Sequence, residues 1–169
     1  MSKAAKPESI PNLMSDSTTF KQMVAACEGI VTEVFPWDLA ELLESKEPPL
    51  LLDIREPYEF NAVRIRDSIN VPRGILESAC EYDYEETIPE LVKARDREIV
   101  VVCRSGNRSL LAGMVMKQLG YRKISSLKTG LRGWNDFEQE LTDNENQLVT
   151  VDDADEYFTP KLRPEQKAP

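Results

Sequence analysis

The sequence predicts an α/β fold: a three-layer sandwich with a central parallel sheet and helices on both faces. Two short segments, 50–54 and 99–102, are apolar almost throughout, which is typical of strands buried on both faces. Segments with helical spacing of apolar residues alternate with them along the chain. Such alternation is the pattern of a parallel sheet, and ligands in these sheets bind beyond the carboxyl ends of the strands.

The composition limits what this chain binds. Its 169 residues predict one domain with tails. A net charge of −9 argues against nucleic acid or an anionic membrane surface as a direct partner. No apolar run approaches the roughly 20 residues of a membrane span, and the N-terminus lacks the pattern of a secretory signal. We therefore expect a cytoplasmic protein without membrane association.

Cysteine and histidine usage narrows the chemistry. The three cysteines, Cys27, Cys80 and Cys103, are odd in number and widely spaced, which indicates neither a disulfide framework nor a zinc site. The chain has no histidine, and this excludes a Cys–His or Ser–His–Asp catalytic pair and any metal site built on imidazole. We expect no metal, no organic cofactor and a reducing compartment.

Residues 1–29 form a predicted N-terminal extension with a short helix. Residues 1–15 are polar with prolines and are expected to be loose. The helix is predicted from Asp16 or Ser17, with Gly29 at its C-cap. Its apolar residues recur at helical spacing at Phe20, Met23, Val24 and Cys27.

The first half of the domain contains the first buried strand. A helix is predicted to begin at Pro36, because proline suits the first helical position. The other elements expected here are the strand at 50–54, a helical turn from Pro57 through Phe60, a strand at 68–71 stopped by Pro72, and helical pieces over 74–95 interrupted at Pro89.

The second half continues the alternation and ends in an acidic segment. The predicted elements are a strand at 98–102, a helix at 107–119 ended by Gly120, a strand at 124–127, and a helix from Gly130 and Gly133 to about 141. Residues 142–169 hold seven acids and three bases with few apolar residues. We interpret them as an acidic C-terminal tail, either disordered or laid along the domain, that is solubilising or used for docking and has no catalytic role.

Cys103 is the candidate nucleophile. It stands between the strand at 98–102 and the helix from 107, so it faces backbone N–H groups and the positive end of the helix dipole. Arg104 and Arg108 lie in the same loop, and this environment favours a thiolate over a thiol. A cysteine after a Val-rich strand is otherwise more often a core residue. Cys27, on the apolar stripe of the predicted N-terminal helix, is interpreted as a core residue. Cys80 lies among acids, which blunt the reactivity of a thiol.

Four motifs in register resemble the rhodanese, or thiosulfate sulfurtransferase, family. They are residues 52–60 (LDIREPYEF), 65–72 with SINVP at its end, the loop 103–109 (CRSGNRS), and Gly120-Tyr121 followed by Gly130 and Gly133-Trp134. The resemblance covers residues 30–141 and implies a single rhodanese domain with the rhodanese-like sandwich. One departure is Arg64, which stands where many members have a histidine.

The resemblance implies sulfur transfer through a persulfide. Cys103 takes a sulfane sulfur from thiosulfate or a persulfide donor and gives it to cyanide or a thiol. The substrate-binding residues are then those of the loop: Arg104, Ser105, Gly106, Asn107 and Arg108. Their N–H groups can form a concave nest for anionic sulfur, and Gly106 allows the backbone to turn.

Two alternatives stay open. In the first, the domain is a sulfur-relay or binding module that acts on a protein acceptor, with the N-terminal helix and acidic tail as docking elements. In the second, more distant alternative, the domain is a phosphatase or arsenate reductase. Only four residues separate Cys103 from Arg108, whereas cysteine-based phosphatases place one residue more there to cradle a phosphate.

Two other charged features have structural interpretations. Asp53 and Arg55 are expected to form a buried or half-buried ion pair that fixes the turn after the first strand. Arg64 and Arg66 are expected on a solvated surface, with contact to a donor or partner as the lesser alternative.

Overall fold

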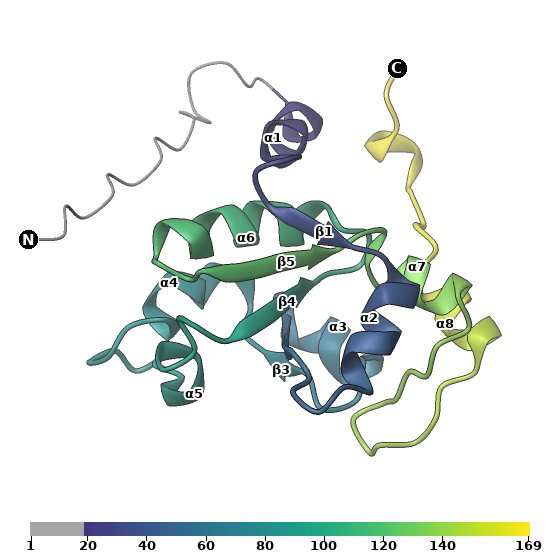
Figure 1. Ribbon diagram of the computed structural model, residues 1–169. Helices are drawn as coiled ribbons and strands as arrows, with labels where there is room; N and C mark the ends of the chain where they lie inside the picture. The colour runs from purple at the N-terminus through teal and green to yellow at the C-terminus, as the bar shows by residue number, and fades with distance from the viewer. Residues whose placement is uncertain (1–18) are drawn as a thin grey trace, which may run out of the picture.

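The computed structural model describes residues 19–169 as a three-layer α/β sandwich (Figure 1). Five parallel strands form the central sheet in the order β1-β5-β4-β2-β3. The strands are β1 (Thr32–Val34), β2 (Leu50–Asp53), β3 (Ile69–Asn70), β4 (Glu98–Val102) and β5 (Lys123–Leu127). The predicted parallel sheet is therefore confirmed.

Helices cover both faces of this sheet. The α-helices are α1 (Phe20–Cys27), α2 (Pro36–Leu43), α3 (Pro57–Ala62), α4 (Leu76–Ala79), α5 (Pro89–Val92), α6 (Asn107–Gln118), α7 (Gly130–Asp136) and α8 (Val151–Phe158). Two 3₁₀ turns, η1 (Arg73–Ile75) and η2 (Pro164–Gln166), complete the described elements.

The alternation of side chains along the central strands builds two separate cores. Ile99 and Val101 of β4 join a core with α1, α4, α5 and α6 on one face. Val100 and Val102 join a second core with α2, α7 and α8 on the other face. Because both faces of β4 are covered, its sequence is apolar throughout rather than alternating.

Several boundaries differ from the sequence prediction for local reasons. β1 was not predicted, since it has three residues and only its register beside β5 makes it a strand. Pro89 begins α5 instead of interrupting a helix. α7 ends at Asp136, short of residue 141, because Glu138 adopts a left-handed backbone with φ +56°. The predicted loose segment 1–15 and helix start at Asp16 or Ser17 lie outside the described residues, and Thr19 caps α1.

The acidic C-terminal segment lies against the domain as far as α8. Thr142 forms an antiparallel bridge with Arg64, with backbone bonds of 2.8 and 2.9 Å. Ala154 and Phe158 of α8 are fully buried in the second core, on α7. Their spacing of four residues gives α8 one apolar edge among its acids. Beyond α8 the chain projects from the domain (Figure 1).

None of the helices between residues 19 and 169 has the length and apolar character needed to cross a bilayer.

Candidate active site

Cys103 lies directly after β4, a central strand of the sheet, and Asn107 begins α6 four residues later. The carboxyl end of the sheet is where parallel α/β folds bind ligands. Cys103 is almost completely buried, with 1% of its surface exposed. The loop between strand and helix therefore closes over the sulfur.

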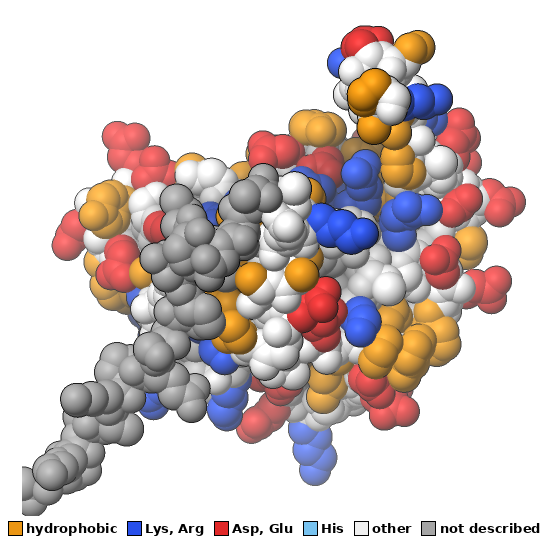
Figure 2. All heavy atoms as spheres, turned by 90° about the horizontal axis from the view of Figure 1, so that it is seen from above, with side chains coloured by type: hydrophobic (Ala, Val, Ile, Leu, Met, Phe, Trp, Pro, Cys, Tyr) orange, Lys and Arg blue, Asp and Glu red, His pale blue; other side chains and the backbone are white. Residues whose placement is uncertain are grey.

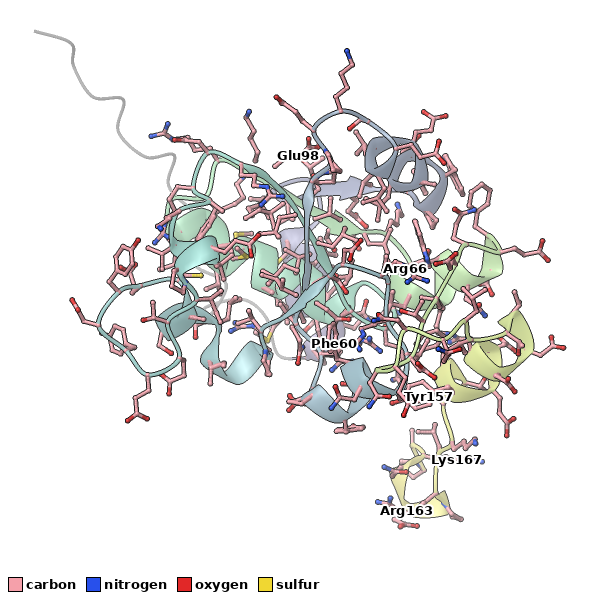
Figure 3. The ribbon with its side chains drawn as sticks, turned by 90° about the horizontal axis from the view of Figure 1, so that it is seen from below. Phe60, Arg66, Glu98, Tyr157, Arg163 and Lys167 are labelled. Atoms are coloured by element: carbon pink, nitrogen blue, oxygen red, sulfur yellow. The ribbon has the colours of Figure 1, made fainter. Side chains whose placement is uncertain are left out.

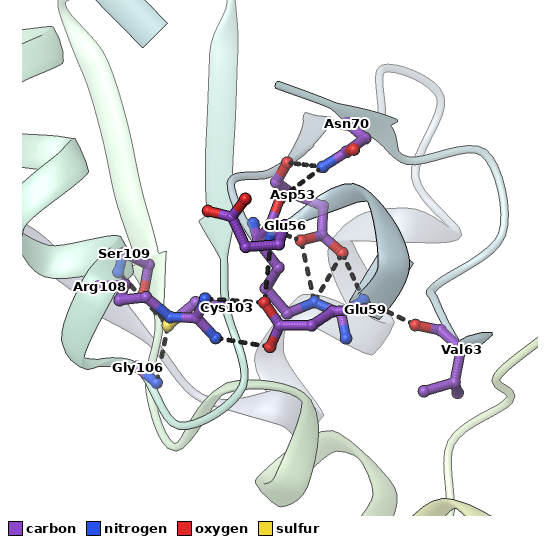
Figure 4. Close-up of polar contacts among 10 residues, drawn as sticks. Asp53, Glu56, Glu59, Val63, Asn70, Cys103, Gly106, Arg108 and Ser109 are labelled. Atoms are coloured by element: carbon purple, nitrogen blue, oxygen red, sulfur yellow. Dashed lines mark hydrogen bonds and ion pairs between the residues drawn. The ribbon is translucent and has the colours of Figure 1, made fainter. Parts of the chain in front are cut away.

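Two backbone N–H groups and one hydroxyl group surround the Cys103 sulfur (Figure 4). The N–H groups of Gly106 and Ser109 donate to Sγ at 3.1 and 3.3 Å, and the Ser109 hydroxyl lies 3.3 Å from it. Ser126 of β5 holds that hydroxyl through a 2.7 Å hydrogen bond. Converging donors of this kind stabilise negative charge on sulfur.

Gly106 gives the loop its turn. Its φ is +92°, in the left-handed region that glycine adopts without strain. A Cβ at this position would lie 3.2 Å from the Thr129 nitrogen and 3.3 Å from the Leu127 oxygen. A larger residue would thus have to move the loop, and with it the N–H that faces the sulfur.

Arg108 forms a bidentate ion pair with Glu59 of α3. Its Nη1 and Nη2 atoms donate to the two carboxylate oxygens at 2.9 and 2.8 Å. Burial alone raises the pKa of the Glu59 carboxyl, but hydrogen bonds from Arg108 and the Glu56 backbone outweigh it and lower the pKa. The hydrogen bonds that Arg108 donates to Glu59 in turn raise the pKa of Arg108. The pair ties the start of α6 to α3.

The other loop residues face outward. Arg104 is half-buried and its side chain lines a hollow of about 330 Å³ beside the loop. Its backbone carbonyl accepts a 3.0 Å hydrogen bond from the Arg132 N–H, which joins the loop to α7. Ser105 and Asn107 are exposed.

A second ion pair lies deeper at the same end of the sheet. Arg55 Nε and Nη2 donate to Asp53 at 2.8–3.2 Å, and Nη2 also donates to the Val63 carbonyl at 2.6 Å. Asn70 Nδ2 bonds the carbonyls of Asp53 and Arg55, both at 2.9 Å. Both charged residues are fully buried, so the expected ion pair is confirmed and holds the turn after β2.

Cys27 and Cys80 are buried free thiols in the first core. Burial raises the pKa of both. For Cys80 the charges of Glu77 and Glu81 are secondary causes, so burial and not the neighbouring acids dominates its environment. Among residues 19–169 no group of three or more acids and cysteines is placed to hold a metal ion.

The two arginines before β3 engage other parts of the chain. The Arg64 guanidinium lies 4.4 Å from the centre of the Phe60 ring and donates to the Asp143 carbonyl at 3.3 Å. Arg66 pairs with Glu140 at 2.9 Å on the surface. Arg64 thus packs between α3 and the C-terminal segment.

A larger hollow, of about 460 Å³, lies at the opposite end of β2, beside Leu50 and Leu51. Four of its charged lining residues are paired with each other, Arg66 with Glu140 and Arg97 with Glu90 at 3.2 Å. The candidate nucleophile therefore does not lie at this larger hollow, and the smaller one borders its loop through Arg104.

Sequence reasoning missed two partners of the loop, Glu59 and Ser126. Glu59 had a local signal: it follows Glu56 at the spacing of a capping box, and the Glu56 N–H donates to it at 3.0 Å. Ser126 had none, because only the register of β5 against β4 brings it to Ser109.

Known proteins of this fold have similar sequences. The chain is 28% identical over 135 residues to a putative mitochondrial thiosulfate sulfurtransferase of Schizosaccharomyces pombe, covering 78% of this chain and 95% of that protein. It is 31% identical over 105 residues to a sulfurtransferase of Allochromatium vinosum, covering 62% and 89%. A Rhodopseudomonas palustris protein of unknown function, described as a possible tyrosine phosphatase, superposes with a TM-score of 0.66 at 22% identity, covering 80% and 98%, and shares the fold. The model of the rhodanese-like domain matches residues 36–137, and this chain belongs to that family.

Proposed function

We propose that this protein is a sulfurtransferase in which Cys103 carries the sulfur as a persulfide. The observation that carries the proposal is the sulfur of Cys103 at the end of β4, within 3.1 and 3.3 Å of two backbone N–H groups. Fixed N–H groups stabilise an anionic sulfur without a histidine. The names of the two sulfurtransferase relatives support this reaction class, and the first supports thiosulfate as donor.

The reaction has two steps that need no external oxidant or reductant. The Cys103 thiolate attacks the outer sulfur of thiosulfate, a new S–S bond forms, and sulfite leaves with the electron pair of the broken bond. A thiolate or cyanide then attacks the outer sulfur of the persulfide. That sulfur leaves on the acceptor, and the Cys103 thiolate is regenerated.

The loop residues have different roles in this scheme. The N–H groups of Gly106 and Ser109 hold the thiolate and the persulfide anion. Arg104, whose side chain borders the hollow, attracts the anionic donor. Ser105 and Asn107 form the exposed rim of the loop. Arg108 sets the position of the loop through Glu59 and adds positive potential.

The pairing of Arg108 argues against phosphate chemistry. A cysteine-based phosphatase uses the arginine of its loop to bind phosphate oxygens, and here both guanidinium nitrogens of the fork contact Glu59. The short loop, with four residues between Cys103 and Arg108, favours a single sulfur atom over a tetrahedral oxyanion. A cytosolic setting agrees with three free thiols in the described residues.

Intact-protein mass spectrometry after incubation with thiosulfate tests the proposal. Wild type should gain about 32 Da, one sulfur atom, and Cys103→Ser should gain nothing. Addition of cyanide should remove the extra mass. No gain on wild type with either thiosulfate or an organic persulfide would overturn the proposal. A gain with the organic persulfide alone would favour a relay that takes sulfur from another thiol.

A further inference from the structure

The hollow beside the active-site loop has two walls that are distant in sequence. Tyr58 and Glu59 of α3 and Arg104 of the loop form one wall; Tyr157, Thr159 and Lys161 of the C-terminal segment form the other. Its volume of about 330 Å³ lies in the range of about 300–1,000 Å³ that is usual for pockets that bury small organic ligands. Thiosulfate, a compact anion, fills only part of such a space.

The part of the C-terminal wall that carries Tyr157 is held in place by α8. Phe158, next to Tyr157, is 1% exposed in the second core. The Thr150 side chain caps α8 by accepting from the Asp153 N–H at 3.1 Å, and Asn135 Nδ2 donates to the Val151 carbonyl at 2.9 Å. Tyr157 is consequently presented to the hollow by a rigid element.

The hollow is positively charged in an acidic protein. Arg104 and Lys161 line it, and its single carboxylate, Glu59, is neutralised by Arg108. Lys161 lies 3.9 Å from Glu156 in a solvated ion pair, which leaves its ammonium group available to a ligand. Burial raises the pKa of the Tyr157 phenol, so this group stays a neutral hydrogen-bond donor. Figure 2 shows Lys and Arg side chains gathered at the base of the projecting C-terminal segment.

We propose that the C-terminal segment completes the acceptor site, and that Lys161 and Tyr157, with Arg104, bind the carboxylate of a small thiol that receives sulfur from Cys103. The proposal rests on the sulfurtransferase function proposed above. The acceptor thiolate attacks the outer persulfide sulfur, a new S–S bond forms on the acceptor, and the Cys103 thiolate leaves. The carboxylate takes no part in this exchange, so its effect is on binding alone.

The test uses a matched pair of acceptors on the full-length, persulfide-loaded protein. N-acetylcysteine carries a carboxylate, and N-acetylcysteinamide differs from it by a neutral amide. Lys161→Ala should raise the KM for N-acetylcysteine about threefold, the size expected for a solvated charge contact, with kcat unchanged. The KM values for the amide and for cyanide should not change. Tyr157→Phe should also raise the KM for N-acetylcysteine alone, by a smaller factor. Lys161→Arg, which keeps the positive charge, should have the wild-type KM.

Lys167→Ala is the matched control. Lys167 is an exposed lysine of the same segment that does not line the hollow, and Figure 3 shows it on the projecting part of the chain that also carries Arg163. Its loss changes the net charge by the same amount and should leave all three KM values unchanged. An equal change in Lys161→Ala for the acid and the amide, or an equal effect of Lys167→Ala, would overturn the proposal.

A second readout does not depend on sulfur transfer. Iodoacetate and iodoacetamide alkylate the same thiol and differ in the same carboxylate. The ratio of their rates at Cys103 should fall about threefold in Lys161→Ala and stay constant in Lys167→Ala. An unchanged ratio in Lys161→Ala refutes the carboxylate site even if thiosulfate fails to load Cys103, so the two proposals fail separately.

Discussion

Two arginine–carboxylate pairs lie at the same end of the sheet and differ in burial and in what they join. Arg55 and Asp53 are two residues apart, and their side chains are 0% and 1% exposed. Arg108 and Glu59 are 49 residues apart, and their side chains are 33% and 10% exposed. The first pair fixes one turn from within the core. The second keeps part of its hydration and joins the loop 103–109, through Arg108, to α3. Burial thus separates a structural pair from a positioning pair with the same chemistry.

Removal of Arg55 should give the largest loss of stability. Arg55→Ala leaves the Asp53 carboxylate buried without its partner, and breaking a buried ion pair in this way costs about 3–5 kcal/mol. Urea denaturation measures the free energy of unfolding directly. If the single variant does not fold, the double variant Asp53→Asn/Arg55→Met, which leaves no buried charge unpaired, should fold and lose less. A loss below about 1 kcal/mol in Arg55→Ala would show that the pair is not structural.

Glu59→Gln should cost less stability and more activity. The half-hydrated Arg108 tolerates the loss of its partner better than a buried ion does, so we expect about 1–2 kcal/mol. Sulfur transfer should slow severalfold, because the loop loses its bond to α3. Glu140→Gln is the control: it removes a carboxylate from Arg66 at a similar distance of 2.9 Å, but on an exposed surface. It should cost below about 0.5 kcal/mol and leave transfer unchanged.

The fold was predictable from the sequence where burial leaves a pattern. The apolar segments of β2 and β4 and the prolines that begin α2, α3 and α5 mark local structure by themselves. β1 carries no comparable local pattern and α8 carries only its capping Thr150 and first-turn acids; they pack on β5 and α7 respectively. An acidic helix with one apolar edge is hard to distinguish from a solvated tail without its partner.

The candidate site likewise has residues that a local sequence pattern locates and residues that only tertiary contacts bring together. Cys103 and the loop 103–109 are contiguous, so the strand–loop–helix pattern locates them. Glu59 and Ser126 reach the loop from α3 and β5, and Lys161 lines the hollow beside it; only the packing of the chain brings them there. The missing information was tertiary: which carboxylate meets Arg108, and which segment covers the hollow.

The Glu59 pair should also produce a pH-dependent difference in stability. The pKa of Glu59 is lowered in the folded protein from its ordinary value of 4.5. Its stabilising contribution is therefore fully present above that value and is lost as the pH falls through the lower folded pKa. The gap in unfolding free energy between wild type and Glu59→Gln should shrink between about pH 6 and pH 3. A gap that stays constant or widens on acidification would contradict the assignment. Glu140→Gln should show little gap at any pH.

Ser126→Ala should have the smallest effect and provides the uncharged reference for both pairs. The change removes the 2.7 Å partner of the Ser109 hydroxyl, which lies 3.3 Å from the Cys103 sulfur. A neutral hydrogen bond contributes about 0.5–1.5 kcal/mol, and we expect a loss of this size with transfer slowed about twofold. Because no titrating group is lost, the difference from wild type should be constant from about pH 6 to pH 3. Ser125→Ala, at the neighbouring half-buried position of β5, is the control and should leave transfer unchanged. A loss of transfer as large as that of Glu59→Gln would mean that the contacts from Ser126 through Ser109 to Cys103, and not the Glu59–Arg108 pair, set the position of the sulfur.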